Sequence, residues 1–422
     1  MSTPIFPIRE CYCPAHFGNA YEAMWPREMA AYLGEMKWWG FNRYGDWITT
    51  TDICNPFTSD AFWDLAKEQF DRKKKAFLAA QELGLALNLI VTPNHVYLDQ
   101  LRPHYAAVKG PRIQGQLICP SHDEARKVIF ENFEHWFGAF AASGIRLSAF
   151  TAFAYDYGAC GCEKCKPWIL TFARLMKEIH AIAGKHHPGI EPWFCSWWWT
   201  PEEHALLNDW AAKEAPGWLK AITLHIEYGQ TIAPARIPAT LAGIAAQGAD
   251  GFQAYSEGVF DDCNKALLAG LGSGQYKEPA HALRHYAKRY FGTPPNMADR
   301  WADWMLPWGD RTKANLRVSR FQWDQLSRTV KPTWRLAHWR CKMELESLDR
   351  QIGQPKDDEW TPEKLKLADK FWSEQEYLQR NIYKLGPVRH VFTPKFMPPL
   401  WYDSWQRKVQ SAPKQQQMQK EA

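Results

Sequence analysis

Short apolar or aromatic segments alternate with longer helical patterns along residues 6–272, and this order restricts the fold more than any other feature. Repeated strand-then-helix order implies a parallel sheet, and seven or eight such units predict closure into a barrel. An eighth strand is expected in Thr231–Thr240 or around Leu268–Gly274. The seven strand candidates are Ile8–Cys13, Gly40–Trp47, Leu85–Thr92, Ile145–Phe153, Glu191–Trp198, Ala221–Glu227 and Gly251–Tyr255. The helical patterns between them are Pro26–Trp38, Asp60–Leu83, His122–Ala142, Pro167–Ala183, Pro201–Ala215 and Ile237–Gln247.

The pattern changes after about residue 275, where no further apolar β-run appears. We therefore predict an α/β protein in three parts: a TIM (β/α)8-like barrel over residues 1–275, an α-helical C-terminal domain over 276–409 and a polar, disordered tail over 410–422. The apolar faces of the helical part exceed what one barrel surface needs, which is compatible with a homodimer. The predicted helices of this part are Glu278–Phe291, Ala298–Met305, Thr312–Asp349 and Thr361–Ile382.

Tryptophan is the unusual residue in the composition: the chain has 23 Trp, and aromatic residues make up 14% of it. A core does not need so many indoles, because Leu and Ile pack without a polar group that requires a partner. Sugars favour indoles, since the axial C–H groups of a pyranose pack on an aromatic ring. Most of the Trp residues are expected to be packing residues. The run Trp197–Trp199 ends a predicted strand, where alternate residues point to opposite faces, so at least one of its rings should face the barrel interior or mouth.

The charge of the chain does not indicate a nucleic-acid partner, because the net charge is only +5 over 422 residues and the basic residues are scattered. The one dense cluster, residues 72–75, lies in an amphipathic helical pattern that is typical of a solvated face. The N-terminal residues lack the regions of a signal peptide and no stretch reaches 18 apolar residues, so we expect no membrane span. Ten Cys at uneven spacings then indicate a reducing, cytoplasmic location with free thiols or metal ligands.

Polar and aromatic residues gather at the ends of the predicted strands. In a (β/α) barrel the active site lies at the C-terminal ends of the strands, so these residues are candidates for contact with substrate. Asp46 is expected to accept a substrate hydroxyl or to shape its loop rather than to act as a catalyst. The candidate substrate-binding residues are Arg43, Asp46 and Trp47 at the second strand, Asn94 and His95 after the third, Trp197, Trp198 and Trp199 at the fifth, His225 at the sixth and Tyr255 at the seventh.

Carboxyl groups are also found at these strand ends. Cleavage of a glycosidic bond normally uses two of them: one protonates the leaving oxygen, and the other attacks the anomeric carbon or activates water. Strand-end carboxyls at positions four and seven lie across the mouth of many barrels. Asp156 and Glu257 hold those positions here, and Glu227, after the sixth strand, is an alternative acid.

The sharpest motif is the C-x-C-x2-C run of Cys160, Cys162 and Cys165. Three thiolates at this spacing in a tight loop can surround one tetrahedral metal ion, most plausibly zinc, and Cys119 is the best candidate for a fourth ligand. Such an all-cysteine site would be structural, because no coordination position stays open for substrate. The alternative is that these residues are reduced thiols, or that two of them form a disulfide.

Two segments carry a resemblance to known families. The stretch from Tyr155 to Trp168 resembles the D-x-G-G-C-x-C-x2-C-x-P-W stretch of glycoside-hydrolase-like barrel proteins, and its cysteine spacing resembles the zinc cluster of family 42 β-galactosidases. The stretch from Tyr255 to Lys265 is similar to a Y-S-E-G-x-x-x-D-x-N-K stretch of the same barrel proteins. The resemblance implies an acid/base after the fourth strand and a nucleophile after the seventh. By position these fall on Asp156 and Glu257.

The sequence therefore predicts a glycoside hydrolase, retaining and exo-acting on short oligosaccharides, that uses Asp156 as acid/base and Glu257 as nucleophile. One alternative is a metal-dependent sugar isomerase or lyase on the same barrel, with His95, His225, Glu227 and Asp46 as ligands of an open metal site. The other is a non-catalytic carbohydrate-binding protein that keeps the aromatic surface without the acid. A bound divalent ion at the mouth, or binding without hydrolysis, would distinguish them.

Overall fold

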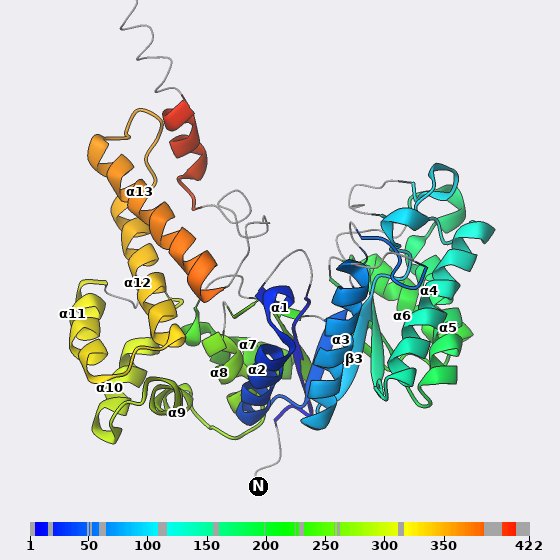
Figure 1. The fold of residues 1–422 in the computed structure, drawn as a ribbon, viewed down its shortest axis with the longest axis horizontal. Helices are drawn as coiled ribbons and strands as arrows, with labels where there is room; N and C mark the ends of the chain where they lie inside the picture. Colours follow the sequence, from blue (N-terminus) through cyan, green and yellow to red (C-terminus); the bar gives the residue numbers. More distant parts are fainter. Residues whose placement is uncertain are drawn as a thin grey trace, which may run out of the picture.

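A computed structural model gives the fold of the chain (Figure 1). The described residues are 5–15, 20–48, 50, 53–58, 65–108, 116–154, 160–197, 199–223, 225–227, 232–256, 258–259, 262–310, 316–383 and 399–410.

Eight parallel strands form one sheet that nearly closes into a barrel. Along the sheet their order is β6-β5-β4-β3-β2-β1-β8-β7, so the strands at its two ends follow each other directly in the chain. The strands are β1 (Ile8–Tyr12), β2 (Arg43–Trp47), β3 (Ala86–Val91), β4 (Ala149–Phe153), β5 (Glu191–Cys195), β6 (Ala221–Thr223), β7 (His225–Glu227) and β8 (Gly251–Tyr255). The barrel predicted from the alternating pattern is confirmed.

The predicted eighth strand is found in a different place from the one expected. The single strand expected over Ala221–Glu227 is divided in two: β6 pairs with β5 and β7 pairs with β8. The two segments proposed for an eighth strand are helical among their described residues. The first holds a 3-10 turn at Pro234–Arg236 and the start of α7 (Ile237–Ala246), and the second holds the end of α8 (Asp262–Gly272). Pro234 and Pro238 explain the first case, because proline fits the first turn of a helix and cannot donate to a sheet.

Helices follow the strands at most of the positions that the periodicity predicts. Thr200 accepts a hydrogen bond from the Glu203 backbone and the Glu203 side chain accepts one from Thr200, so a capping box starts α6. Figure 1 shows α4, α5 and α6 gathered on one side of the molecule, and α4 and α6 each pack on α5. The helices of this region are α1 (Ala20–Ala23), α2 (Pro26–Trp39), α3 (Leu65–Glu82), α4 (Asp123–Ala142), α5 (Trp168–His186), α6 (Pro201–Glu214), α7 (Ile237–Ala246) and α8 (Asp262–Gly272).

The strands sort their side chains into two separate cores. Outward-facing residues such as Tyr44, Leu89 and Phe194 join the large core between sheet and helices. Inward-facing residues at the C-terminal ends form a second cluster of their own. Successive residues of a strand point to opposite faces, so a shift of one residue changes which core a side chain enters. The inner cluster consists of Tyr12, Trp47, Ile90, Phe153, Cys195 and Tyr255, with Trp197 packed against it.

The helices after the barrel pack largely through tryptophan. Trp304 contacts the rings of Trp301, Trp323 and Trp339, with centroids 5.1–5.8 Å apart. These indoles are therefore packing residues. Figure 1 shows α12 and α13, which pack on each other, on the opposite side of the molecule from α4–α6. The helices of this part are α9 (Pro279–Phe291), α10 (Pro295–Met305), α11 (Leu316–Leu326), α12 (Trp334–Ile352) and α13 (Pro362–Tyr377), with a further helical segment at 402–410.

The single helix predicted over Thr312–Asp349 is wrong. The chain forms α11, a 3-10 turn at Ser327–Thr329 and then α12. Pro332 lies in the break, where it lacks the N–H that an uninterrupted helix needs. Thr333 then caps α12 by accepting a hydrogen bond from the Leu336 backbone.

A buried ion pair joins the C-terminal helices to the barrel. Arg335 of α12 donates two hydrogen bonds to Asp262 at the start of α8, at 2.7 and 2.9 Å, and Tyr286 of α9 donates a third at 2.7 Å.

In the part of the chain that is described, no helix is both long and apolar enough to cross a bilayer.

Candidate functional site

A ring of aromatic side chains lies in the barrel interior at the C-terminal ends of the strands. Trp197 stacks on Phe153 with centroids 5.7 Å apart, and His225 lies 4.8 Å from Trp197 and 4.7 Å from Tyr255. Trp47 completes this side, 6.3 Å from Phe153. The structure therefore brings together four of the predicted substrate-binding residues.

A buried polar network lies in the barrel interior beneath this aromatic ring. Glu10 of β1 accepts hydrogen bonds from Asn88 of β3 and Gln253 of β8, at 2.8–3.0 Å. Burial raises the pKa of Glu10 to about 7, despite the opposing effect of Arg43 and the two amides. Sequence reasoning missed this carboxyl. Its signal is a Glu two residues before Tyr12 in a short predicted strand, a spacing that puts both side chains on one face.

Arg43 belongs to this lower network and not to the mouth. It is the first residue of β2, so it lies at the N-terminal end of its strand. Its guanidinium lies 4.0 Å from Glu10, donates to Ser148 at 3.1 Å and covers the ring of Trp193 at 4.4 Å. These contacts hold the lower layer of the barrel together.

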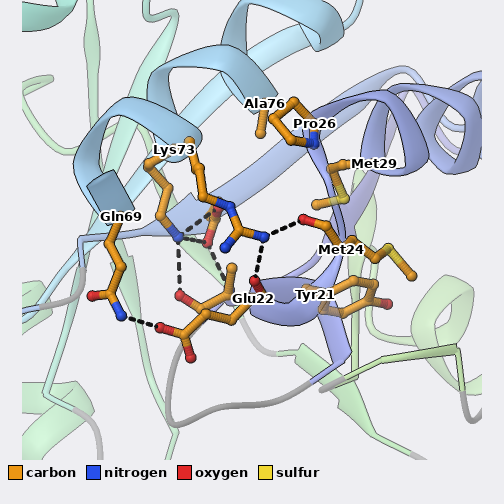
Figure 2. Close-up of a pocket in the computed structure, with 11 residues that line it drawn as sticks. Tyr21, Glu22, Met24, Pro26, Met29, Gln69, Lys73 and Ala76 are labelled. Atoms are coloured by element: carbon orange, nitrogen blue, oxygen red, sulfur yellow. Dashed lines mark hydrogen bonds and ion pairs between the residues drawn. The ribbon is translucent and has the colours of Figure 1, made fainter. Parts of the chain in front are cut away.

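Asp46 faces outward from the barrel, toward α3. Lys73 of α3 donates to both carboxylate oxygens at 2.8 Å, and the Ala15 backbone and the Tyr44 hydroxyl donate to them as well. Figure 2 shows Lys73 beside a small pocket of about 40 Å³ whose apolar wall includes Met29 and Ala76. Asp46 is thus part of an ion pair between sheet and helix, on the face opposite to its neighbour Trp47.

Three further candidates make contacts with other parts of the protein. Asn94 is fully buried and donates to the Ile118 carbonyl at 2.9 Å. His95 lies 2.7 Å from the Thr50 hydroxyl, and burial lowers its pKa to about 4. Trp199 packs on Trp168 and belongs to the outer core. Trp198 lies outside the described residues.

The three predicted carboxyls lie at or beside the limits of the described structure. Asp156 and Glu257 are outside the described residues, and only the backbone of Glu227, at the end of β7, is described. Their neighbours in the chain place the attachment points: β4 ends at Phe153 and β8 at Tyr255. Three strands, β3, β2 and β1, separate β4 from β8 in the sheet, so these two strands belong to opposite sides of the barrel.

The four predicted metal ligands lie together. The sulfur atoms of Cys119, Cys160, Cys162 and Cys165 are all within 4.8 Å of one another, and Cys119 lies 3.8 Å from Cys162 and 3.7 Å from Cys165. Four sulfurs bound tetrahedrally to zinc at about 2.3 Å would be about 3.8 Å apart. The donor set and its spacing therefore fit a zinc ion. The three clustered cysteines follow β4 in the loop that also contains Asp156, so a metal here would brace that loop.

Comparisons with known proteins give distant structural matches. No protein-family model and no curated protein matches the chain. A family 5 glycoside hydrolase from Streptomyces cattleya aligns at 12% identity over 47% of each chain, with a TM-score of 0.31, so the match spans about half of that protein. A family 138 enzyme that targets pectin rhamnogalacturonan II aligns at 11% identity over 96% of this chain and 61% of its own, with a TM-score of 0.41. An α-amylase from Geobacillus thermoleovorans aligns at 9% identity over 66% of this chain and 80% of its own, with a TM-score of 0.40. Similarity at this level does not define a fold, so the barrel assignment rests on the strand order.

Proposed function

We propose that this chain is a retaining glycoside hydrolase that acts from the end of short oligosaccharides. The observation that supports the proposal is the aromatic ring of Trp47, Trp197, His225 and Tyr255 at the C-terminal ends of the strands. Flat aromatic surfaces pack on the C–H face of a sugar, and this end of a barrel is where catalysis takes place. Imported fragments are the substrates that a cytoplasmic enzyme would meet, which favours exo action.

In this mechanism Asp156 and Glu257 divide the chemistry. Asp156, after β4, protonates the leaving oxygen while Glu257, after β8, attacks the anomeric carbon and forms a glycosyl ester. Asp156 then deprotonates the water that releases the sugar. A retaining enzyme requires about 5–5.5 Å between the two carboxyl groups. Attachment on opposite sides of the barrel mouth is compatible with two groups that approach one bond from opposite faces.

The test is a pair of variants assayed on a panel of aryl glycosides and short oligosaccharides. E257A should lower kcat by about 10⁴-fold or more, because the nucleophile is lost. D156N should lower it by about 10²–10⁴-fold, because proton transfer is lost. Azide should restore turnover of E257A, since a small anion can attack in place of the carboxylate. Normal activity of E257A would refute the mechanism.

The matched control is E191Q. Glu191 begins β5 at the opposite end of the barrel, where its carboxylate accepts a hydrogen bond from Trp193 at 3.0 Å. This carboxyl lies at the N-terminal end of its strand, away from the mouth. Its neutralisation should therefore leave kcat and KM within about twofold of the wild type. Loss of activity in E191Q comparable to E257A would mean that any change in the barrel disables the protein.

A non-catalytic carbohydrate-binding protein is the second candidate. The observation that favours it is the cluster of aromatic side chains at the mouth, which is the kind of surface on which a sugar ring packs. Binding of an oligosaccharide by wild type and E257A alike, with no hydrolysis by either, would support this function. The sugar isomerase or lyase finds less support, because Asp46, one of its four candidate ligands, pairs with Lys73 on the outer face of the sheet.

We also propose that the cysteine cluster holds a structural zinc ion. Four thiolates would complete its coordination, so the ion would have no open position for substrate or water. Its contribution would be to fix the loop between β4 and α5, which contains Asp156.

A further inference from the structure

A buried polar cluster lies beneath the turn that follows β8; we call it the Lys265 cluster, and it consists of Tyr21, Ser256 and Lys265. The ammonium of Lys265 is 2.7 Å from the Tyr21 hydroxyl and 2.7 Å from the Ser256 hydroxyl, and the two hydroxyls are 3.0 Å apart. Lys265 is fully buried, and Tyr21 and Ser256 are each only 3% exposed. Tyr21 lies in α1, Ser256 directly follows β8 and Lys265 lies in α8.

The cluster includes the side chain of the residue before Glu257 and is hydrogen-bonded to the backbone of the residue after it. Ser256 immediately precedes Glu257 and Gly258 follows it. The Gly258 carbonyl accepts a hydrogen bond from Tyr21 at 2.8 Å and one from Ser256 at 2.7 Å. Lys265 donates to both of these hydroxyls and so orients their protons toward that carbonyl. The turn is therefore tied at the residue before Glu257 and at the residue after it.

Placing an ammonium in this core has an energetic cost that packing alone does not require. Removing a charged amine from water is unfavourable unless hydrogen bonds and nearby charge offset the loss, and an apolar side chain of similar volume would avoid the cost. The Tyr21 and Ser256 hydroxyls, each 2.7 Å from the ammonium, supply part of the compensation as hydrogen-bond acceptors. What the ammonium provides that a Leu or Met could not is a rigid hydrogen-bonded link to the turn.

We propose that Lys265 is a positioning residue that, through Tyr21 and Ser256, holds the Ser256–Gly258 turn so that the Glu257 carboxylate is presented to the anomeric carbon. The inference rests on the proposed function, in which Glu257 is the nucleophile. Attack requires the reacting atoms to be held near about 3–3.5 Å, and a displacement of about 1 Å can reduce the rate by about 10²-fold. A turn bonded on both sides of the nucleophile meets this requirement.

The first variant is Y21F, which removes one hydroxyl and retains the packed ring. It should lower kcat by about 10–10²-fold and leave KM within about twofold, because the position of the nucleophile affects the transition state more than the binding of substrate. K265M should have the same or a larger effect on kcat. If K265M does not fold, Y21F decides the question on its own.

The matched control is Y32F. Tyr32 is buried, and its hydroxyl lies 3.5 Å from that of Tyr21, but the contacts that hold Gly258 come from Tyr21 and Ser256. Removal of this second hydroxyl should leave kcat within about twofold. Equal losses of kcat in Y21F and Y32F would attribute the effect to the core in general and would overturn the proposal.

A second measurement separates positioning from a general effect on structure. In E257A the carboxylate that the cluster holds is absent, so the azide-rescued rate of E257A and of Y21F/E257A should be equal. A rescued rate that falls with Y21F would overturn the proposal, because the cluster would then act on something other than Glu257. If Y21F and K265M keep full kcat while E257A is inactive, the positioning inference fails and the hydrolase proposal stands. If E257A is active, the proposed function itself fails.

Discussion

Arg335 provides the sharpest test of how the C-terminal helices stabilise the barrel. It forms a bidentate pair with Asp262, whose side chain is 1% exposed and which also accepts a hydrogen bond from Tyr286. R335M would leave a buried carboxylate with only the Tyr286 hydroxyl among these donors. Breaking a buried pair in this way costs about 3–5 kcal/mol. Loss of the guanidinium from the rings of Tyr290 and Trp334, at 3.8 and 4.2 Å, adds about 1 kcal/mol.

The assay is urea unfolding of R335M followed by both tryptophan fluorescence and circular dichroism, so that a non-two-state transition is detected. We expect the free energy of unfolding to fall by about 4–6 kcal/mol. The double variant R335M/D262N should recover much of this loss, because it contains no unpaired buried charge. A partial recovery therefore distinguishes the cost of an orphaned carboxylate from simple loss of packing.

The matched control is the pair of Arg407 and Asp357, which has the same bidentate geometry at 2.8 and 2.9 Å but whose side chains are 60% and 54% exposed. Solvent screens an exposed pair, so R407M should lower the free energy of unfolding far less than R335M does. A loss below about 1 kcal/mol in R335M, or equal losses in the two variants, would refute the argument from burial.

Two further predictions concern the barrel and the cysteine cluster. The pKa of Glu10 in the folded state is raised to about 7, so the folded protein binds this proton more tightly than the unfolded chain. The contribution of this group to stability should be fully present below about pH 4.5 and fall by about 3 kcal/mol as the pH rises to 7. E10Q should weaken this pH dependence, measured as the difference in the free energy of unfolding in urea between pH 5 and pH 8. An equal difference in the wild type and E10Q would contradict the prediction. C165S should reduce bound zinc, measured by mass spectrometry of the purified protein, from about one ion per chain to near zero, whereas C54S, at an exposed cysteine, should not change it. Wild-type protein that binds no zinc when refolded with it would refute the assignment.

The order of elements could be predicted from the sequence because it depends on local patterns. Strand candidates such as Ile8–Cys13 and helices such as α2 were recognisable from apolar periodicity and proline positions, which act within a few residues. The C-x-C-x2-C spacing and the isolated Cys119 likewise indicated a cluster that the structure confirms. The local pattern did not predict the break at Pro332, because helical periodicity on both sides of it indicated one helix where the structure has two.

Only the tertiary structure decided which face each strand residue occupies and which distant residues meet. Asp46 and Trp47 are adjacent in the chain, yet one pairs with α3 and the other lines the barrel interior, because the register of the sheet sets the inward face. Tyr21 and Lys265 are 244 residues apart and meet only when β1 and β8 close the barrel. Local periodicity determines the secondary-structure elements, whereas these long-range contacts depend on how the elements pack. They therefore cannot be predicted from residue spacing in the sequence.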